Sequence, residues 1–429
     1  MTARQPEPLE RARTRMRELQ LWSPRQQMGR RWPVGCVALE VTQRCNLDCT
    51  ACYLSESSEA LHDLPLEELF RRIEQIRAWY GPDTDVQITG GDPTLRRADE
   101  LAAIVRRARE AGLRSTLFTN GIRASRPLLA QLGAAGLEGV AFHVDTTQQR
   151  KGYANEVELN ALRSEYLERA RGLPLAVYFN TTVHGGNLDE VPELVRYFIE
   201  RGDIVRLASF QLQAATGRGV LGQRGPAVSV AAVIESIQRG ARAQLDFDAM
   251  DIGHPRCNRY AMALVANGRA HDALDDAALV AEVLERTARL RLDRVRTWRA
   301  LVVFAAALAR HPRTLARALG WAARKAWAMR RDLLAGRGRV RKLSFFVHDF
   351  MDACDLDPQR VAACSFMVAS PDGPVSMCAH NARRDDYLLR PAAVRGGYWD
   401  PVTGCTCAQP VVQPVRLTRK NARGRARVS

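Results

Sequence analysis

The chain has 429 residues, a net charge of +16 and 46% hydrophobic residues, a composition typical of a globular protein with a sizeable core. Its length predicts one large domain with a smaller one, or two to three modules. The N-terminal stretch has no apolar segment of the signal-peptide type and no apolar run reaches the roughly 18 residues of a membrane span, so we expect a cytoplasmic protein.

Along the chain, residues 1–35 predict a basic N-terminal arm that contains an arginine-rich helix. Strands and helices then alternate: strands are predicted at 36–43, 85–90, 114–121, 140–145, 175–183 and 204–213, and helices at 66–80, 98–111 and 188–200. Six strands separated by helices predict a parallel sheet that right-handed crossovers curl. We therefore expect an α/β fold, a partial (β/α)6 TIM-type barrel over residues 36–245. Chemistry in such folds gathers at the C-terminal ends of the strands.

The second half of the chain differs in character. Residues 246–345 predict a linker with a helical insert, in which residues 286–342 hold 17 Lys or Arg against only two Asp. Residues 346–410 are loop-rich and bear cysteines, so they predict a small C-terminal module held by a metal centre. Residues 411–429 predict a disordered basic tail.

Three cysteines, Cys45, Cys49 and Cys52, directly follow the first predicted strand. Ten cysteines in a reducing compartment indicate metal or redox chemistry before disulfides. A loop of this length can wrap an iron–sulfur cluster, for which soft thiolates are suitable ligands. Three protein ligands would leave one metal position open for a substrate or cofactor. The alternatives are a zinc site with a fourth ligand from elsewhere, and a chance cluster.

Polar residues and glycines follow the other predicted strands. The second strand ends in Gly90-Gly91-Asp92, and glycines at such a turn let the backbone approach a ligand closely. The later strands end with Asn120 and Gly121, Asp145, Asn180 with Thr182, and Gln211. Each of these is a candidate ligand-binding residue, and the alternative for each is an ordinary turn or cap.

The pattern Cys-x3-Cys-x2-Cys followed by Tyr53, after the first strand of a βα array, resembles the radical S-adenosylmethionine (radical SAM) superfamily. The resemblance implies a [4Fe–4S] cluster on the three cysteines, with its open iron chelated by the methionine end of SAM. It also implies reductive cleavage of SAM to a 5′-deoxyadenosyl radical, which abstracts hydrogen from an unactivated C–H bond. The residues expected to contact SAM are Tyr53, Gly90, Gly91, Asp92, Pro93, Thr94, Asn120, Asp145, Thr182 and Gln211. Asp92 stands where the superfamily usually has Glu.

Three later segments, "FQLQAATGRG" (210–219), "HPRCNRY" (254–260) and residues 350–381, resemble the archaeal tetraether lipid synthase group, with its relatives once called class D methylases. In that group these segments carry ligands of auxiliary iron–sulfur clusters. The chain departs from the group in having no cysteine before Cys36 and no second cysteine just before "HPRC".

The remaining cysteines predict one auxiliary [4Fe–4S] cluster. Its candidate ligands are Cys257, Cys364 and Cys378, with Cys405 or Cys407 as the fourth. The alternative is a set of buried, inert cysteines with or without a zinc ion. Cys36 is expected in the core, and Cys354 in a helix with a structural role.

The basic segment 286–342 suits the surface of an anionic membrane, RNA phosphates, or a solvated helical pair over the barrel mouth. With the group resemblance, we expect hydrogen abstraction from an alkyl chain of a lipid or isoprenoid, leading to C–C coupling or another C–H functionalisation. The enzyme would be cytoplasmic or peripheral on the inner face of the membrane, with an electron donor such as flavodoxin or ferredoxin. The alternatives are modification of RNA or a ribosomal peptide, and a non-enzymatic metal-binding regulator.

Overall fold

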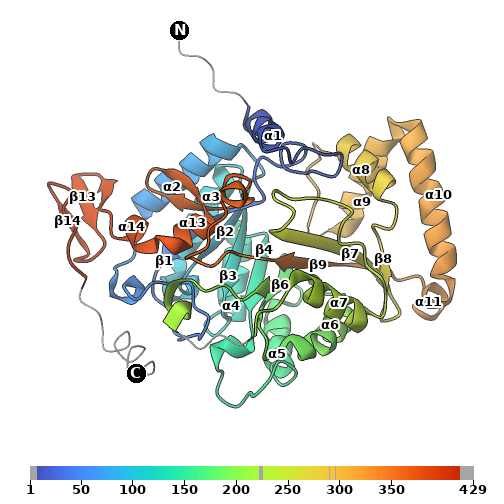
Figure 1. Cartoon of the computed structure of the whole chain (residues 1–429), viewed down its shortest axis with the longest axis horizontal. Helices are drawn as coiled ribbons and strands as arrows, with labels where there is room; N and C mark the ends of the chain where they lie inside the picture. The colour runs from blue at the N-terminus through green and yellow to red at the C-terminus, as the bar shows by residue number, and fades with distance from the viewer. Residues whose placement is uncertain (1–6, 222–225, 289, 295, 416–429) are drawn as a thin grey trace, which may run out of the picture.

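A computed structural model of the chain describes residues 7–221, 226–288, 290–294 and 296–415 (Figure 1). Its centre is an 11-stranded sheet in the order β11-β10-β1-β2-β3-β4-β5-β6-β9-β7-β8. The first six strands pair in parallel and in chain order. They are β1 (Cys36–Thr42), β2 (Asp85–Gly90), β3 (Arg114–Thr119), β4 (Gly139–His143), β5 (Ala176–Val183) and β6 (Val205–Leu212). The expected α/β part-barrel is therefore confirmed.

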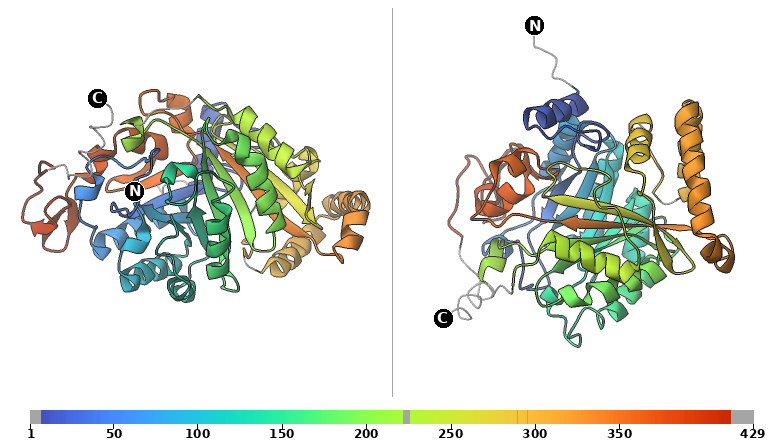
Figure 2. Two further views of the ribbon diagram at one scale, coloured as in Figure 1. Left: turned by 90° about the horizontal axis from the view of Figure 1, so that it is seen from below. Right: turned by 45° about the vertical axis from the view of Figure 1, so that its right-hand side comes forward.

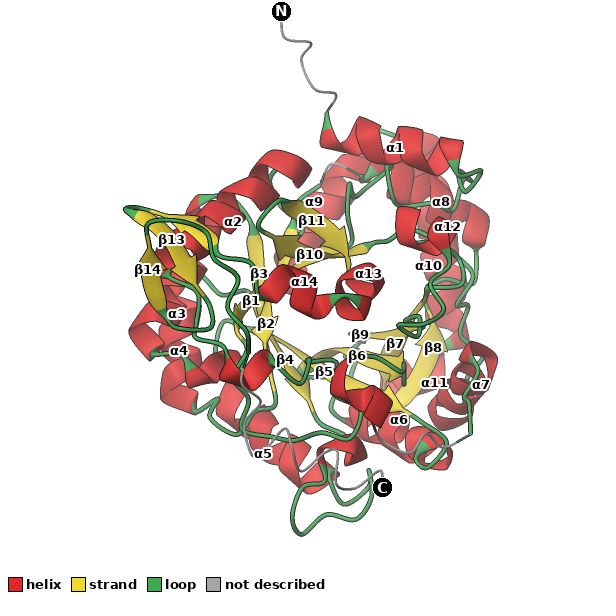
Figure 3. Ribbon diagram, turned by 60° about the vertical axis from the view of Figure 1, so that its left-hand side comes forward, coloured by secondary structure: helices red, strands yellow, loops and turns green. Residues whose placement is uncertain are grey.

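Helices cover the outer face of this curved sheet, as Figure 3 shows. They are α2 (Leu66–Tyr80), α3 (Ala98–Glu110), α4 (Arg126–Ala135), α5 (Asn160–Ala170), α6 (Val191–Glu200) and α7 (Val230–Ala241). In α2, the helical spacing of Leu69, Ile73 and Ile76 puts all three on one fully buried face against the sheet. The helix ends at Gly81, whose φ of +82° suits glycine.

Two strands from the C-terminal half extend the parallel sheet at its two edges. β9 (Arg341–His348) pairs with β6, and β10 (Phe366–Ser370) pairs with β1, so eight neighbouring strands run parallel. Antiparallel strands β7 (Asn258–Ala266), β8 (Arg269–Asp272) and β11 (Gly373–Ser376) complete the sheet. None of these five strands was predicted from the sequence. The division into five segments stays a prediction, although the sheet itself runs through three of them.

The basic segment is helical, as expected. It begins at the last residue of α8 (Ala277–Arg286) and contains α9 (Thr297–Ala309), α10 (Pro312–Ala328) and α11 (Arg330–Ala335). These helices stand beside the β7–β8 hairpin at one end of the molecule (Figures 1 and 2). No helix among the described residues has the length and apolarity needed to cross a membrane.

The ends of the chain add smaller elements. Helix α1 (Pro8–Glu18) is the predicted arginine-rich helix and packs near α2. The C-terminal part holds α12 (Pro358–Ala362), α13 (Met377–Ala382) and α14 (Arg384–Leu388), then an antiparallel sheet of β12 (Ala392–Val394), β13 (Gly397–Asp400) and β14 (Cys405–Cys407). Most of the predicted basic tail, residues 416–429, lies outside the described residues.

Candidate active site

The turn after β2 is joined to the loop that follows β1 by backbone contacts. The Gly91 N–H donates to the Thr42 carbonyl at 2.9 Å, and the Asp92 N–H donates to the Arg44 carbonyl at 2.8 Å. A Cβ atom on Gly91 would lie 2.0 Å from the Arg44 carbonyl oxygen, and Gly90 has a φ of +125°. Only glycine allows this approach, so the pair of glycines is required by the backbone itself.

The three cysteines of the first loop line one cavity together with Gly90 and Gly91. Burial raises the pKa of Cys45 and strongly raises the pKa of Cys49, and the neighbouring Cys52 raises both further. The three sulfurs are therefore within one another's electrostatic reach. Thiols in this state need a cation to give up their protons, and iron supplies that charge. The donor set thus fits an iron–sulfur cluster with one open position.

The segment Thr216-Gly217-Arg218 packs on this loop. The Arg218 guanidinium lies 3.2 Å from the Cys52 sulfur and donates to the Glu59 carboxylate at 2.8 Å. A Cβ on Gly217 would lie 2.2 Å from the Tyr53 carbonyl oxygen. The group resemblance assigned this segment to auxiliary-cluster ligands, whereas the structure places it at the first cysteine loop. The role of Arg218 was missed because its contact joins two distant loops.

Tyr53 forms part of the cavity wall. Its hydroxyl donates to the Gly90 carbonyl at 2.5 Å, and the Arg384 guanidinium lies 4.9 Å from its ring centroid. Arg384 also pairs with Glu40 at 2.6 Å, and both side chains are buried. This pair, which no local pattern indicated, holds α14 over β1 and fixes the ring of Tyr53. Contact of Tyr53 with the adenosine end of SAM stays a prediction.

The Asp92 side chain is fully buried and forms hydrogen bonds with neighbouring groups of the protein. Its carboxylate accepts from the Thr94 N–H at 2.9 Å, the Thr119 hydroxyl at 2.9 Å and the Asn120 N–H at 2.8 Å. It therefore ties the end of β2 to the end of β3. Neither Asp92 nor its neighbours Pro93 and Thr94 line the cavity, so their expected contacts with SAM gain no support from the structure.

The ends of β3 to β6 contribute polar side chains to the cavity wall. The Asn120 amide donates to the Asn46 side chain at 2.6 Å and lies 4.0 Å from the Cys45 sulfur. Of the other predicted residues, those that line the cavity are Asn180, Thr182 and Gln211. The Asn180 amide donates to Gln211 at 3.2 Å, so these two strand ends are linked. The structure thus brings these side chains to the same cavity as the cysteines.

His143 is a cavity residue that the sequence did not single out. Its ring lies 2.6 Å from Asp145, which is fully buried and also accepts from the Thr182 N–H at 2.8 Å. Burial lowers the pKa of His143, but the Asp145 carboxylate raises it by more. Burial likewise raises the pKa of Asp145, but His143 lowers it below the usual range. Asp145 therefore positions the imidazole and does not itself line the cavity.

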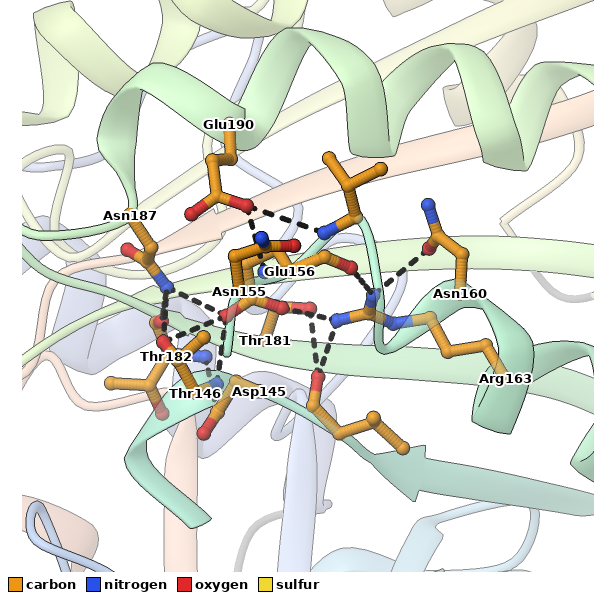
Figure 4. Close-up of polar contacts among 12 residues, drawn as sticks. Asp145, Thr146, Asn155, Glu156, Asn160, Arg163, Thr181, Thr182, Asn187 and Glu190 are labelled. Atoms are coloured by element: carbon orange, nitrogen blue, oxygen red, sulfur yellow. Dashed lines mark hydrogen bonds and ion pairs between the residues drawn. The ribbon is translucent and has the colours of Figure 1, made fainter. Parts of the chain in front are cut away.

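A buried network supports the turn after Asp145 (Figure 4). The Glu156 carboxylate accepts from the Thr146 N–H and from the Asn187 amide, each at 2.8 Å, and pairs with Arg163. The Glu156 and Arg163 side chains are at most 1% exposed. The Asn187 amide also donates to the Thr182 carbonyl at 2.9 Å, which connects the network to β5. The ends of β4 and β5 are held rigid in this way.

Three of the later cysteines lie close together. The Asn258 amide donates to the Ser365 hydroxyl at 2.9 Å, which brings the neighbouring Cys257 and Cys364 together. Burial, together with the charges of Cys364 and Cys257, raises the pKa of Cys378 to about 12. The Arg360 guanidinium lies 3.2 Å from the Cys257 sulfur. This second group of thiols therefore resembles the first in burial and in its neighbouring arginine.

Cys405 and Cys407 do not join this group. Both lie in β14 of the separate three-stranded sheet, where Cys405 contacts the Thr403 carbonyl (Figure 3). The structure therefore does not support either as the fourth thiolate. Cys354 is exposed in a turn, not in the predicted helix, and Cys36 is buried in β1 as expected.

The cavity itself has a volume of about 1940 Å³. It extends from the first cysteine loop to helices α8, α9 and α10, which supply mainly apolar side chains to its far wall. These include Leu279, Val283, Phe304, Leu308, Leu315 and Trp321. The site thus combines a metal-binding loop, a histidine paired with a buried carboxylate, and a long apolar extension.

These features define a part-barrel whose first loop binds an iron–sulfur cluster. Residues 39–198 match the model of the Radical SAM superfamily, and they include the three cysteines and the Gly90–Gly91 turn. This part of the chain is therefore similar to the radical SAM superfamily, and the match implies a [4Fe–4S] cluster and SAM as cofactors.

Two curated relatives are similar over part of their length. The chain is 31% identical over 186 residues to a 7,8-dihydro-6-hydroxymethylpterin dimethyltransferase of Methanocaldococcus jannaschii, covering 42% of this chain and 36% of the relative. It is 30% identical over 225 residues to a PqqA peptide cyclase of Xanthomonas campestris pv. campestris, covering 51% and 58%. The chain thus spans less than two thirds of either relative.

Among solved structures, Streptococcus suis SuiB bound to S-adenosylmethionine aligns with a TM-score of 0.37 and 14% identity, over 53% of this chain and 49% of that chain. A likeness this remote supports no conclusion about substrate. No tetraether synthase appears among these relatives, so the expected subgroup gains no support from them.

We predict that Gly91→Ala slows 5′-deoxyadenosine release on the order of a hundredfold, because the added Cβ forces the turn and the cysteine loop apart. The measurement is the release rate with dithionite and SAM, together with iron content after anaerobic reconstitution. Gly133→Ala is the matched control, since a Cβ there would lie no closer than 3.5 Å to its neighbours. An unchanged rate in Gly91→Ala contradicts the close-approach argument.

We also predict a pH-dependent loss of stability in His143→Gln. The raised pKa of His143 adds stability that is complete below about pH 6.5 and is lost as pH rises through the folded value. The lowered pKa of Asp145 adds stability that is complete above about pH 4 and is lost as pH falls. Denaturant titrations measure the free energy of unfolding of wild type and of His143→Gln at each pH. The value for wild type should therefore exceed that for the variant most between about pH 4 and about pH 6.5. His311→Gln, outside the pair, should show no such difference.

Proposed function

We propose that this protein is an enzyme that cleaves SAM reductively and abstracts hydrogen from a substrate held in the large cavity. The observation that carries the proposal is the set of three half-buried thiols, Cys45, Cys49 and Cys52, on the cavity wall beside the Gly90–Gly91 turn. A three-thiolate set leaves one metal position open for the methionine end of SAM. The match of residues 39–198 to the superfamily model supports the same chemistry.

When bound, a reduced [4Fe–4S] cluster supplies the electron that breaks a carbon–sulfur bond of SAM and releases the 5′-deoxyadenosyl radical. The residues of the chain prepare the place for this chemistry. Arg218 offsets negative charge at Cys52, and Gly91 lets the turn approach the cysteine loop. Tyr53, Asn120 and Gln211 are proposed to contact the adenosine end. An electron donor such as flavodoxin or ferredoxin is proposed to supply the electron.

We further propose an auxiliary iron–sulfur cluster on Cys257, Cys364 and Cys378. Its support is the mutual proximity of these thiols and the Arg360 guanidinium beside Cys257. A cluster there would use three thiolates from the described residues, as the first one does.

Two substrate classes are each favoured by one observation. A peptide substrate is favoured by the relatives, because several of them are named PqqA peptide cyclases. An alkyl chain of a lipid or isoprenoid is favoured by the apolar side chains of α8 to α10 along the cavity. The comparisons favour the peptide over the lipid, and neither they nor the cavity favour RNA.

Reconstituted wild-type protein should bind about eight irons per chain and release 5′-deoxyadenosine with dithionite and SAM. Cys45→Ala/Cys49→Ala/Cys52→Ala should keep about four irons and lose the release. Cys257→Ala/Cys364→Ala/Cys378→Ala should also keep about four irons but retain the release. Cys354→Ala, at an exposed turn, should match wild type. No release from wild type, with zinc in place of iron, would favour the metal-binding regulator.

The substrate class is tested by comparing a deletion strain with its complemented parent by untargeted lipidomics and peptidomics. The expected result is the loss of one modified species that returns with wild-type protein and not with Cys45→Ala. A missing peptide product supports the first class and a missing alkyl product the second. A strain that lacks neither contradicts both.

A further inference from the structure

Helix α9 is unusual in being apolar around most of its circumference and yet largely exposed. Its sequence, TWRALVVFAAALA, contains one charged residue, Arg299. A helix of this composition is ordinarily buried in a core or in a membrane. Only Ala307 and Leu308 are buried here, whereas Leu301 is 68% exposed. Something outside the described chain is needed to cover the rest.

The exposed apolar surface continues onto α10 and α11. Eight of the fourteen exposed large hydrophobic side chains among the described residues lie between positions 298 and 340. We call this surface the α9–α11 patch: Trp298, Leu301, Val302, Val303, Leu319, Trp327, Leu334 and Val340. Patches of this kind mark contact sites for other molecules.

The cationic side chains around the patch fall into two groups, those in ion pairs with described residues and those without. On the inner side of α10, Lys325 pairs with Asp275 and Arg317 pairs with Glu282, which anchors the helix to the neighbourhood of α8. Other arginines of this region are exposed and have no ion pair with any described residue. These include Arg310, Arg313 and Arg331. The helices that carry the apolar patch therefore also carry cationic side chains that are unpaired within the described chain.

The patch also lies at an opening of the large cavity. Leu301 and Leu319 are 68% and 60% exposed, and both line the cavity that reaches the first cysteine loop. Other side chains of the same helices, such as Phe304 and Leu315, line its interior. The exposed apolar surface is thus continuous with an apolar interior.

We propose that the α9–α11 patch docks on the surface of an anionic lipid membrane and opens the cavity toward it. Aliphatic side chains enter the boundary of the acyl chains, tryptophans lie at the headgroup level, and arginines meet anionic headgroups. At 13 and 17 residues, α9 and α10 are shorter than a membrane span, so they lie along the surface. The proposal concerns docking and is independent of the reaction performed.

Other occupants fit the same surface less well. RNA would meet the arginines but would leave Leu301, Val302 and Val303 without an apolar partner. A second copy docked patch to patch would bring two sets of unpaired arginines together, which repel. A membrane satisfies both the apolar and the cationic side chains.

The test is flotation of the full-length protein with vesicles of phosphatidylcholine and phosphatidylglycerol, 3:1, against vesicles of phosphatidylcholine alone. Wild type should float with the anionic vesicles. Trp298→Ser/Trp327→Ser should lower the partition coefficient about tenfold, because two interfacial anchors are removed. Arg310→Gln/Arg313→Gln should lower it about twenty-five-fold, from roughly fivefold for each charge. Neither pair of residues lines the cavity, so 5′-deoxyadenosine release should be unchanged.

Matched controls separate the patch from exposed residues in general. Trp79→Ser removes a 48% exposed tryptophan elsewhere, and Arg97→Gln/Arg123→Gln removes two exposed arginines elsewhere. All variants keep the basic C-terminal residues, so differences report on the helices alone. The proposal is overturned if wild type does not float, if it floats equally with neutral vesicles, or if patch and control variants behave alike. Salt-sensitive RNA binding or a dimer that the patch variants abolish, without flotation, also overturns it.

Discussion

The site depends on one close approach of two backbone segments. The Gly90–Gly91 turn lies against the loop after β1 at distances that exclude any side chain at Gly91. Because the two segments exchange backbone hydrogen bonds, the cysteine loop takes its position from β2 as well as from β1. Asp92 then extends this coupling to β3 through Thr119 and Asn120. Three successive strands are thereby fixed around one metal-binding loop.

The same principle operates at the later strand ends, where buried charges take the place of backbone contacts. Asp145 holds His143 and the end of β5, and the Glu156–Arg163 pair holds the turn behind them. The Glu40–Arg384 pair does similar work across β1 and α14. Burying such an ion pair costs desolvation free energy, and the buried pair fixes the positions of the segments that it joins. The polar wall of the cavity is rigid. The far end of the cavity is built from α8, α9 and α10, and ion pairs attach α10 to the neighbourhood of α8.

The local pattern was sufficient for the first cysteine loop, the two glycines and the six strands, because each depends on residues near in sequence. Arg218 and Arg384 were missed, because their contacts join segments far apart in the chain. His143 was missed although its partner Asp145 is only two residues away. Cys405 and Cys407 were predicted beside Cys257 for the converse reason: spacing alone gives no information on which thiols meet. The composition of the basic segment left a membrane surface, RNA and a helical pair over the barrel mouth as alternatives, and the structure shows that α9 and α10 line the cavity.

By itself, the sequence determined the chemistry of the first loop and the order of its strands and helices. Thiol spacing and hydrophobic periodicity are local properties, so they can be recognised in the sequence without knowledge of the fold. Only the tertiary structure decided which cysteines gather, where the arginines point and that one cavity joins the cysteine loop to the α9–α11 patch. These depend on β9 and β10 joining opposite edges of the sheet, and pairing between distant segments is set by packing of the whole chain.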